Sequence, residues 1–343
     1  MKALVYTKPY SFEYSDFPDP EVGVDDILVL VKACGICGSD IQGSRGKTGR
    51  RIPPLIMGHE AAGIVEDTGK NVKGFEKGER ICFDSTVYCN KCESCRRGFF
   101  NRCVSRQVLG VSTKDFRKHG AFAEYVAVPW WIAFKIPDNM PFTHAALLEP
   151  VSIAEHAANR ITISHDDTVV VIGAGTIGLF LLQACRIKGA AKLIISDIDE
   201  FRLDVAKRLG ANEVVNPAES SLIETVFKTT ENKGADVTFE AVGYANTFQD
   251  AVSVTKTGGN LVAVGNLEKT VQFDLQDFVS RELTFTGTYA SSGEFCDCIE
   301  PVASGKIDVE PLISEVLPLA HGQEAFDRLL KGEENLLKIV LEP

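Results

Sequence analysis

The sequence predicts two domains of different class, a mostly β domain followed by a doubly wound α/β domain. Its 343 residues are about the length of two average domains. Up to about residue 135 the apolar runs are short, rich in β-branched residues and separated by Gly, Pro and Asp, which indicates mainly antiparallel strands. From about residue 140 apolar strands alternate with helical segments, and this alternation favours a parallel sheet with right-handed crossovers.

The individual elements follow from the period of the apolar residues and from the turn residues between them. In the first domain we expect strands at 27–35, 63–69, 79–83 and 121–129. In the second domain we expect strands at 168–173, 192–197, 213–217, 236–243, 260–265 and 283–289. Helices are expected between them at 144–161, 176–190, 200–211, 221–234 and 246–259. The tail, which the parallel sheet does not need, adds helices at 294–307 and 322–335 and a strand at 336–343.

Composition and charge exclude several classes of function. Lys and Arg total 36 and Asp and Glu total 47, so the formal net charge is −11. No nucleic-acid partner is expected, because such proteins normally carry a basic surplus on one face. Hydrophobic residues make up 45% of the chain, which argues against disorder.

The longest uncharged stretch, residues 168–185, has the minimum length of a membrane span. It carries three glycines between β-branched residues and helix formers, an order that a strand–turn–helix unit explains and a membrane helix does not. The first residues show neither the apolar core nor the cleavage site of a secretory leader, so we expect a cytoplasmic protein without membrane partners. Thiols stay reduced in that compartment, where clustered cysteines bind metal more often than they form disulfides.

The glycine motif GAGTIG stands between a β-branched strand and a helix, which is the context that a dinucleotide-binding turn requires. Gly173 permits the tight turn, Gly175 lets the backbone approach a pyrophosphate, and Gly178 lets the helix pack on the strand. Thr176 and Ile177 open the helix, whose N-terminus faces the phosphates. The motif predicts a bound dinucleotide; the alternative is a glycine turn in a flavodoxin-like sheet without one.

The type of dinucleotide is predicted by Asp197, which ends the next strand, 19 residues after Gly178. A carboxylate there accepts hydrogen bonds from the adenosine ribose and repels a 2′-phosphate, so NAD is favoured over NADP. Arg202, five residues further on, is a candidate to flank the adenine.

Ten cysteines are present, and four of them form the pattern CxxCxxCx7C. These four, Cys89, Cys92, Cys95 and Cys103, suit a tetrahedral structural zinc ion that closes a loop. Iron–sulfur ligation also uses closely spaced cysteines, but no further cluster motif follows here. A closed four-sulfur site has no open coordination position, so we expect it to do no chemistry.

A second set of candidate ligands is more widely spaced in the sequence. It consists of Cys37 in GICGSD, His59 and Glu60 in MGHEAAG, and Glu149 in LLEPVS. Each residue alone is more often a packing residue than a ligand. Together they offer one sulfur, one nitrogen and carboxylate oxygens, which suit a catalytic zinc ion that keeps one position for water or substrate.

The order of these motifs resembles that in the zinc-containing medium-chain dehydrogenases, and most of all in their sorbitol and polyol dehydrogenase branch. The motifs are GICGSD, GHEAAGIVEDTGKNVKGFEKGERI, the four cysteines, EPVSIAEHA and GAGTIG. The resemblance covers essentially the whole chain, and the GHE segment and the cysteine cluster are highly specific. It implies a chaperonin-10-like catalytic domain at 1–150, completed by 287–343, and an NAD-binding Rossmann domain at 151–286. It also implies a small polyol or sugar-derived substrate and a homodimer or homotetramer.

The same resemblance implies roles for individual residues. Cys37, His59 and Glu60 would bind the catalytic zinc, and Glu149 would bind it directly or through a water molecule. Ser39 matches the hydroxyl that relays the substrate proton, whereas Gln42 stands where many relatives carry a histidine. The implied reaction is the reversible zinc- and NAD-dependent oxidation of a secondary alcohol to a ketone.

The segment 43–51 carries four cations and no acid, and two interpretations stay open. It is either a solvated loop or subunit contact, or a basic patch that attracts an anionic substrate such as a polyol phosphate or a sugar acid. Galactitol-phosphate dehydrogenases share the zinc layout. Two further hypotheses are a threonine dehydrogenase, although EPVSIAEHA matches the polyol pattern better, and a non-catalytic NAD-binding protein, although the expected site residues are intact.

Overall fold

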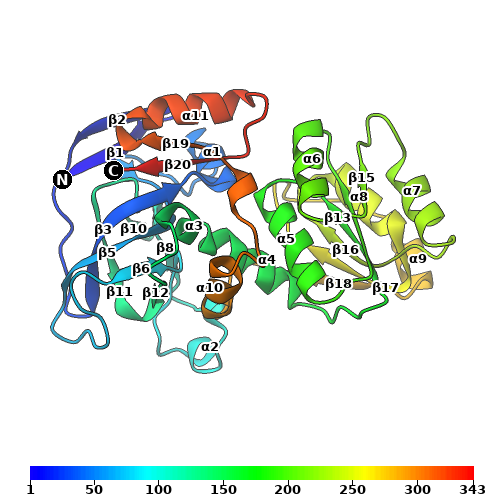
Figure 1. Ribbon diagram of the computed structural model, residues 1–343, viewed down its shortest axis with the longest axis horizontal. Coiled ribbons are helices and arrows are strands. Elements are labelled where there is room, and N and C mark those ends of the chain that lie inside the picture. Colours follow the sequence, from blue (N-terminus) through cyan, green and yellow to red (C-terminus); the bar gives the residue numbers. More distant parts are fainter. The chain divides into compact units, whose positions relative to one another are not determined.

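The computed structural model describes residues 1–343, and the chain folds into two compact units. The first unit comprises Met1–Glu149, Ser291–Gly305 and Val309–Pro343, and the second comprises Pro150–Ala290 and Lys306–Asp308. The chain therefore leaves the first unit to build the second, and it returns with its C-terminal segments, of which only Lys306–Asp308 belongs to the second unit. In Figure 1 the red C-terminal strand lies beside the blue strands of the amino end.

The first unit is built on a seven-stranded sheet in the order β12-β6-β5-β3-β20-β19, with β11 also paired to β3. All pairs are antiparallel except β19 with β20, which confirms the predicted antiparallel character. The strands are β3 (Asp26–Gly35), β5 (Glu60–Thr68), β6 (Arg80–Phe83), β11 (Tyr125–Pro129), β12 (Ala133–Lys135), β19 (Ile313–Pro318) and β20 (Lys338–Glu342). Strand β19 was not predicted from the sequence, because its side chains lack a clear alternation.

Smaller elements surround this sheet. A three-stranded sheet contains β1 (Lys2–Lys8), β2 (Ser11–Asp16) and β4 (Leu55–Ile56). Two short ribbons pair β7 (Thr86–Val87) with β8 (Gln107–Val108) and β9 (Val111–Ser112) with β10 (Arg117–Lys118). The helices of the unit are α1 (Gly38–Ser44), α2 (Glu93–Arg96), α3 (Phe142–Ala146), α10 (Phe295–Ala303) and α11 (Gly322–Lys331). Helix α4 (Leu148–Ala158) connects this unit to the second one.

The second unit is a six-stranded parallel sheet in the order β15-β14-β13-β16-β17-β18. This order reverses direction after β13, as the predicted doubly wound fold requires. The strands are β13 (Thr168–Ile172), β14 (Lys192–Ser196), β15 (Glu213–Val215), β16 (Ala235–Glu240), β17 (Thr255–Ala263) and β18 (Thr284–Gly287). The helices are α5 (Thr176–Ile187), α6 (Glu200–Arg208), α7 (Leu222–Thr229), α8 (Ala245–Val254) and α9 (Leu275–Ser280).

Two predicted helices in this unit end earlier than expected. The helix expected over 221–234 ends at Thr229, before the left-handed residues Glu231 and Asn232. The helix expected over 246–259 ends at Val254, and Thr255 already begins β17. The Thr255 hydroxyl is buried and hydrogen-bonds the Thr238 hydroxyl at 2.8 Å, which ties it to the neighbouring strand. Gly258, at φ +73°, then adopts a left-handed conformation that no helix interior accepts.

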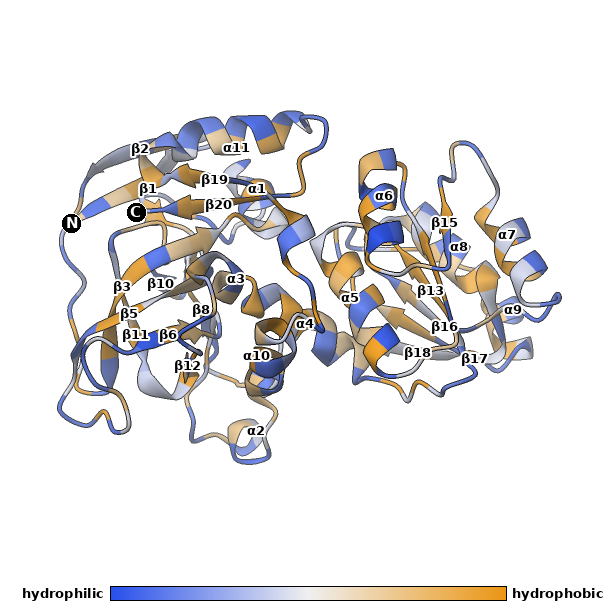
Figure 2. Ribbon diagram, in the orientation of Figure 1, coloured by the Kyte–Doolittle hydropathy of each residue, from blue (hydrophilic) through white to orange (hydrophobic).

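Each unit has its own hydrophobic core. The central strand β13 is hydrophobic along most of its length, whereas α6 carries strongly hydrophilic residues (Figure 2). A strand covered on both faces has to be apolar throughout, which explains why TVVVIG does not alternate. None of the helices is both long enough and apolar enough to cross a membrane.

Candidate metal centres and cofactor site

The three candidate ligands Cys37, His59 and Glu60 are brought together by strand register. Strands β3 and β5 are antiparallel neighbours, and Gly35, the last residue of β3, pairs with Glu60, the first residue of β5. Cys37 follows β3 by two residues as the N-cap of α1, and His59 directly precedes β5. A Cβ atom on Gly35 would lie 2.4 Å from the Glu60 carboxylate, so only glycine leaves room for that side chain.

The ligand atoms of Cys37, His59 and Glu60 all lie within 4.8 Å of one another. His59 and Glu60 are buried, and Cys37 is partly exposed. One sulfur, one imidazole nitrogen and one carboxylate oxygen at such spacing fit a zinc ion with a fourth position for water or substrate. The donor set and its spacing therefore fit the metal that the sequence predicts.

Asp40 orients the histidine of this group, a role that the sequence did not reveal. Its Oδ1 lies 3.4 Å from His59 Nδ1 and accepts a hydrogen bond from Arg51 Nη2 at 3.2 Å. Burial opposes the charge on Asp40, but His59 and Arg51 outweigh it and lower the pKa of this carboxyl to about 2. The Nδ1 side of His59 is thus turned to Asp40, and Nε2 faces the Ser39 hydroxyl at 3.5 Å.

The pKa of His59 responds to the same neighbours. Burial disfavours the imidazolium, but the Asp40 carboxylate and the Cys37 sulfur raise the pKa of His59 well above its ordinary value. A metal ligand must be the neutral imidazole, so metal binding at His59 releases a proton.

Lys338, on β20, is a second buried partner that sequence analysis missed. Its ammonium donates to both oxygens of Glu60, at 2.9 and 2.7 Å, and to the Ile36 carbonyl at 3.1 Å. Burial lowers the pKa of this lysine, but Glu60 and Cys37 outweigh burial and raise it. Lys338 lies 278 positions from Glu60, so no local pattern in the sequence connects the two residues.

Glu149, the fourth candidate, is buried but does not belong to the close group of three. Its Oε1 accepts a hydrogen bond from the Ser85 hydroxyl at 2.6 Å. Burial, together with the nearby Glu60 carboxylate, raises the pKa of Glu149 to about 7, although His59 and Ser85 oppose the shift. The charges of His59 and Glu60 therefore act on the pKa of Glu149, although Glu149 lies outside the close group.

The four cysteines of CxxCxxCx7C form a second close cluster. Their sulfur atoms all lie within 4.8 Å of one another, with Cys92 and Cys95 3.4 Å apart and Cys89 and Cys95 4.0 Å apart. None is in a disulfide. Four sulfurs bonded at about 2.3 Å to one zinc ion lie about 3.8 Å from each other, so this geometry fits the predicted structural zinc.

Backbone groups prepare these cysteines for a cation. The N–H of Cys92 donates to Cys89 Sγ at 3.4 Å, and the N–H of Cys89 donates to Cys103 Sγ at 3.3 Å. Backbone hydrogen bonds from Cys95 and Val104 lower the pKa of Cys92 to about 6. A thiolate is the form that binds zinc, so the backbone donors favour the ligand state at Cys92, whereas burial raises the pKa of Cys95.

The cysteine cluster is fastened to the rest of its unit by aromatic residues. Tyr88, adjacent to Cys89, donates its hydroxyl to the Trp131 carbonyl at 3.1 Å, and Trp131 Nε1 donates to the Tyr88 carbonyl at 3.0 Å. The Tyr88 ring stacks on Phe100 at a centroid distance of 4.2 Å.

The glycine motif turns between β13 and α5. Gly173 has φ +101°, and a Cβ atom on Gly178 would lie 1.8 Å from the Gly173 carbonyl oxygen, so both positions require glycine. Gly175 is the N-cap of α5, and a Cβ atom there would meet no atom within 4 Å. The backbone at Gly175 is thus open to a ligand, as a pyrophosphate site needs.

Asp197 lies beside this turn. Its Oδ2 accepts the Ala174 N–H at 2.7 Å, and its Oδ1 accepts the Asp199 N–H at 3.0 Å. Arg202 contacts Asp199 at 3.3 Å and Asp197 at 4.0 Å. Asp197, the predicted ribose partner, and Arg202, the predicted neighbour of the adenine, therefore lie in one cluster of charged side chains next to the glycine motif.

The basic segment 43–51 is not wholly solvated. Arg51 is buried, pairs with Asp40 and passes over Gly43, where a Cβ atom would lie 2.5 Å from the arginine chain. Arg45 and Lys47 are exposed. Two further histidines that could carry a proton, His119 and His144, have partners elsewhere: His119 accepts the Ile56 N–H at 3.2 Å, and His144 pairs with Glu310 at 2.6 Å.

Comparison with known proteins agrees with this fold and these sites. Residues 23–138 match the family described as "Alcohol dehydrogenase GroES-like domain", and residues 176–304 match "Zinc-binding dehydrogenase". The chain belongs to the zinc-containing medium-chain dehydrogenases. It is 31% identical to sorbitol dehydrogenase from Bacillus subtilis over 100% of this chain and 97% of that protein. It is 33% identical to L-idonate 5-dehydrogenase from Vitis vinifera over 94% and 89%, respectively.

Solved structures show the same architecture. Galactitol-1-phosphate dehydrogenase from Escherichia coli superposes with a TM-score of 0.91 at 26% identity, covering 100% of both chains. An alcohol dehydrogenase from Escherichia coli CFT073, solved with NADH, reaches 0.92 at 28% identity over 100% and 99%. A zinc-binding dehydrogenase from Sinorhizobium meliloti 1021, solved with NADP, reaches 0.92 at 30% identity over 100% and 99%. The chaperonin-10-like (GroES-like) domain plus Rossmann fold expected from the sequence is thereby confirmed.

Proposed function

We propose that this protein catalyses the reversible oxidation of a secondary alcohol in a polyol or sugar-derived substrate to a ketone, with NAD as hydride acceptor. The close group of Cys37, His59 and Glu60 carries the proposal. A zinc ion held there supplies a Lewis acid that lowers the pKa of the alcohol, and the nicotinamide supplies the hydride acceptor. The names of the relatives, sorbitol and L-idonate dehydrogenases, support the substrate class.

The residues around this group divide the work. Asp40 holds His59 in one orientation. Lys338 pairs with Glu60 and so balances the charge of this buried carboxylate. Ser39 accepts the proton of the alcohol and passes it outward; its hydroxyl lies 3.5 Å from His59 Nε2, the nitrogen left free for the metal, and so stands beside the position of the substrate oxygen. Gln42 cannot titrate, so we assign the next step of proton exit to water.

We propose that Glu149 acts through a hydrogen bond to water or substrate and does not bind the metal directly. Its place outside the close group and its bond from Ser85 support this assignment. A carboxyl with a pKa of about 7 exchanges a proton readily near neutral pH, as a group next to a reacting hydroxyl needs.

The cofactor preference rests on Asp197. Its carboxylate beside the glycine turn favours the two free hydroxyls of the NAD ribose and repels the extra phosphate of NADP. Because relatives of this fold have been solved with either cofactor, the preference is tested directly by kcat/KM for NAD and for NADP. Asp197→Ser should lower the preference for NAD, whereas equal preferences in both proteins would contradict the assignment.

The function itself is tested by an NADH-absorbance screen with zinc measured in the same preparation. Sorbitol, xylitol, L-idonate, galactitol 1-phosphate and L-threonine cover the hypotheses, and two zinc ions per chain are expected. Turnover of polyols that is lost with Cys37→Ala and retained with Cys296→Ala supports the proposal. Turnover of threonine alone, or no turnover with any substrate, would overturn it in favour of a threonine dehydrogenase or a non-catalytic NAD-binding protein.

A phosphorylated or acidic substrate remains the second candidate because Arg45 and Lys47 are exposed in the basic segment. The two residues are better targets than Arg51, whose loss would also disturb Asp40. A higher kcat/KM for galactitol 1-phosphate than for galactitol, lost in Arg45→Ala/Lys47→Ala, would support this candidate. Equal values for both substrates, unchanged in the variant, would exclude it.

We also propose that a second copy of the chain packs on the β18 edge of the six-stranded sheet. Strand β18 has a neighbour on one side only, and Phe285, Leu275 and Val279 around it are exposed. An exposed apolar sheet edge is a typical interface, and homodimers and homotetramers are the expected states. Light scattering should show an oligomer that Phe285→Lys dissociates; a monomeric wild type would refute this proposal.

We propose a cytoplasmic location, because the four-cysteine cluster needs reduced thiols to bind zinc. Two zinc ions, one catalytic and one structural, complete the proposed cofactor set.

A further inference from the structure

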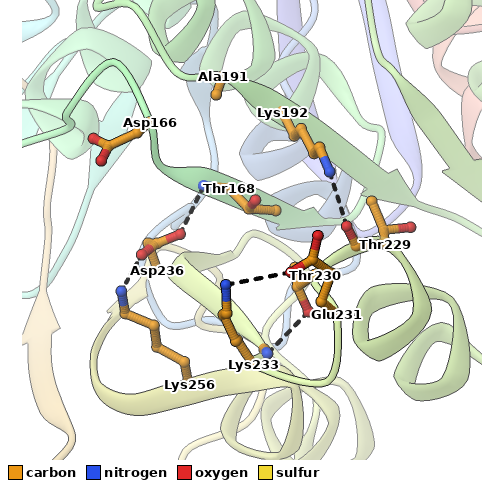
Figure 3. Close-up of a pocket in the computed structure, with 11 residues that line it drawn as sticks. Asp166, Thr168, Ala191, Lys192, Thr229, Thr230, Glu231, Lys233, Asp236 and Lys256 are labelled. Atoms are coloured by element: carbon orange, nitrogen blue, oxygen red, sulfur yellow. Dashed lines mark hydrogen bonds and ion pairs between the residues drawn. The ribbon is translucent and has the colours of Figure 1, made fainter.

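A cavity of about 320 Å³ lies at the edge of the six-stranded sheet where the parallel strands begin (Figure 3). Thr168 and Lys192 are the first residues of β13 and β14, and Asp236 and Lys256 are the second residues of β16 and β17. The turn after α7, residues 229–234, closes another side. The glycine motif follows the opposite end of β13, about 16 Å away along its five residues. The cavity is therefore separate from the candidate cofactor site.

Lys192 is the unusual residue of this cavity. Three lysines line it, and two of them have carboxylate partners: Lys256 contacts Asp236, and Lys233 lies 3.5 Å from Glu231. Lys192 donates only to the Thr229 carbonyl, at 2.9 Å, and forms no ion pair. An ammonium group has three donors, so two remain for a ligand.

The acidic residues of the cavity do not neutralise Lys192. Asp236 accepts the Thr168 N–H at 2.8 Å and pairs with the Lys256 ammonium, so Lys256 already balances its charge. The Asp166 carboxylate points away from Lys192 in Figure 3. Lys233 and Glu231 are 74% and 85% exposed, and such a solvated pair exchanges readily, which makes Lys233 available as a second cation.

The turn that closes the cavity is held in an uncommon conformation. Glu231 and Asn232 have φ +53° and +65°, and Gly234 has φ +87°. Thr230 fixes this turn, since its hydroxyl donates to the Val226 carbonyl at 2.7 Å and accepts the Gly234 N–H at 2.9 Å. Left-handed conformations outside glycine cost energy and gather at binding sites, where the surrounding structure maintains them.

We propose that this cavity binds a small phosphate monoester, with the Lys192 ammonium as its main anchor and Lys233 as its second cation. The volume is at the lower end of the range for ligand sites, which fits a compact metabolite. A doubly charged phosphate has the oxygen acceptors that two ammonium groups can share. Because the site lies on the second unit, the bound ester stabilises that unit by mass action without entering the catalytic chemistry.

The proposal is tested by titration calorimetry with glycerol 3-phosphate and inorganic phosphate on the whole protein. Saturating NAD is present, so that the phosphate sites at the glycine motif are already filled. Lys192→Gln removes the charge with little change in size, and we expect it to weaken binding at least about tenfold. Lys207→Gln is the matched control, because Lys207 is an exposed lysine of α6 that does not line the cavity.

Binding that Lys192→Gln weakens and Lys207→Gln preserves supports the site, and tighter binding of the ester than of inorganic phosphate supports the ligand class. No measurable heat up to about 10 mM ligand overturns the proposal. Equal binding by Lys192→Gln and wild type also overturns it, and so does equal weakening in both variants, which indicates unspecific attraction to lysines. Binding seen only without NAD assigns the phosphate to the glycine motif and equally overturns it.

Discussion

The two ligand clusters of this protein are built in opposite ways. The four cysteines lie within 15 residues, in a loop of short helices and turns, and need no distant strand to meet. Cys37, His59 and Glu60 meet only because β3 pairs with β5, and the ion-pair partner of Glu60, Lys338, comes from the C-terminal strand. The local cluster is the proposed structural zinc site, and the long-range group is the proposed catalytic one. If these assignments hold, stability depends on a local segment of the chain and chemistry on the pairing of distant strands.

The largest expected effect is a loss of activity when the group of Cys37, His59 and Glu60 is altered and the four cysteines are not. Cys37→Ala removes a ligand of the open group but leaves the four-cysteine loop untouched. We expect kcat to fall by about 10⁴-fold, since the Lewis acid supplies several kcal/mol of transition-state stabilisation. Zinc content should fall from two ions to one per chain, measured by atomic emission. Cys296→Ala, which alters an exposed thiol outside both clusters, is the control and should keep both ions. Loss of both ions from Cys37→Ala would show that the clusters are not independent.

The next effect concerns the buried pair that supports the open group. Lys338→Met leaves the Glu60 charge buried without its partner, and such changes cost about 3–5 kcal/mol. Chemical denaturation should show this loss in the free energy of unfolding. Adding Glu60→Gln removes the stranded charge and should restore most of the stability. Lys77→Met breaks a pair that is 69% and 34% exposed and should change little. A double variant as unstable as Lys338→Met would show that packing, not charge, causes the loss.

The next prediction concerns how stability depends on pH through Asp84, a buried residue of the first unit that is hydrogen-bonded to Ser291 in its C-terminal part. Asp84 Oδ2 accepts the Ser291 hydroxyl at 2.8 Å, and burial raises the pKa of this carboxyl to about 6. The folded state holds the proton more tightly than the unfolded state, so stability falls as pH rises from about 4 to about 6 and stays lower above that. A shift of about two pKa units corresponds to about 3 kcal/mol.

Asp84→Asn removes this titration and keeps an acceptor for the Thr86 N–H. Relative to wild type, the variant should gain stability between pH 4 and pH 7 in urea unfolding. Asp16→Asn, at a side chain that is 85% exposed, serves as the control and should show no such gain. Parallel pH curves for wild type and Asp84→Asn would refute the assignment.

Features that depend on local contacts could be predicted from the sequence, whereas features that depend on distant contacts could not. The cysteine spacing, the glycine turn and the alternation of strands and helices are local, so they were predicted and match the structure. The partners Asp40, Lys338 and Ser85 were missed. Asp40 is only three residues from Cys37, but an aspartate in a first helical turn is usually read as a cap. Lys338 sits in an apolar strand where a lysine normally faces solvent, and only the register of β20 with β3 reveals its burial.

The smallest expected effect concerns the local cluster. The protein has two tryptophans: Trp131 exchanges hydrogen bonds with Tyr88 next to Cys89, and Trp130 contacts Trp131 edge-on. Cys92→Ser should free this loop, shift the tryptophan emission to longer wavelength and lower Tm by about 5 °C, or about 2 kcal/mol. The open group should keep its zinc, so kcat should fall far less than with Cys37→Ala. Val104→Ser, at an 83% exposed side chain of the same loop, should leave emission and Tm unchanged. If Cys92→Ser abolished activity as completely as Cys37→Ala, the loop would be part of the catalytic machinery and the division between a structural and a chemical cluster would fail.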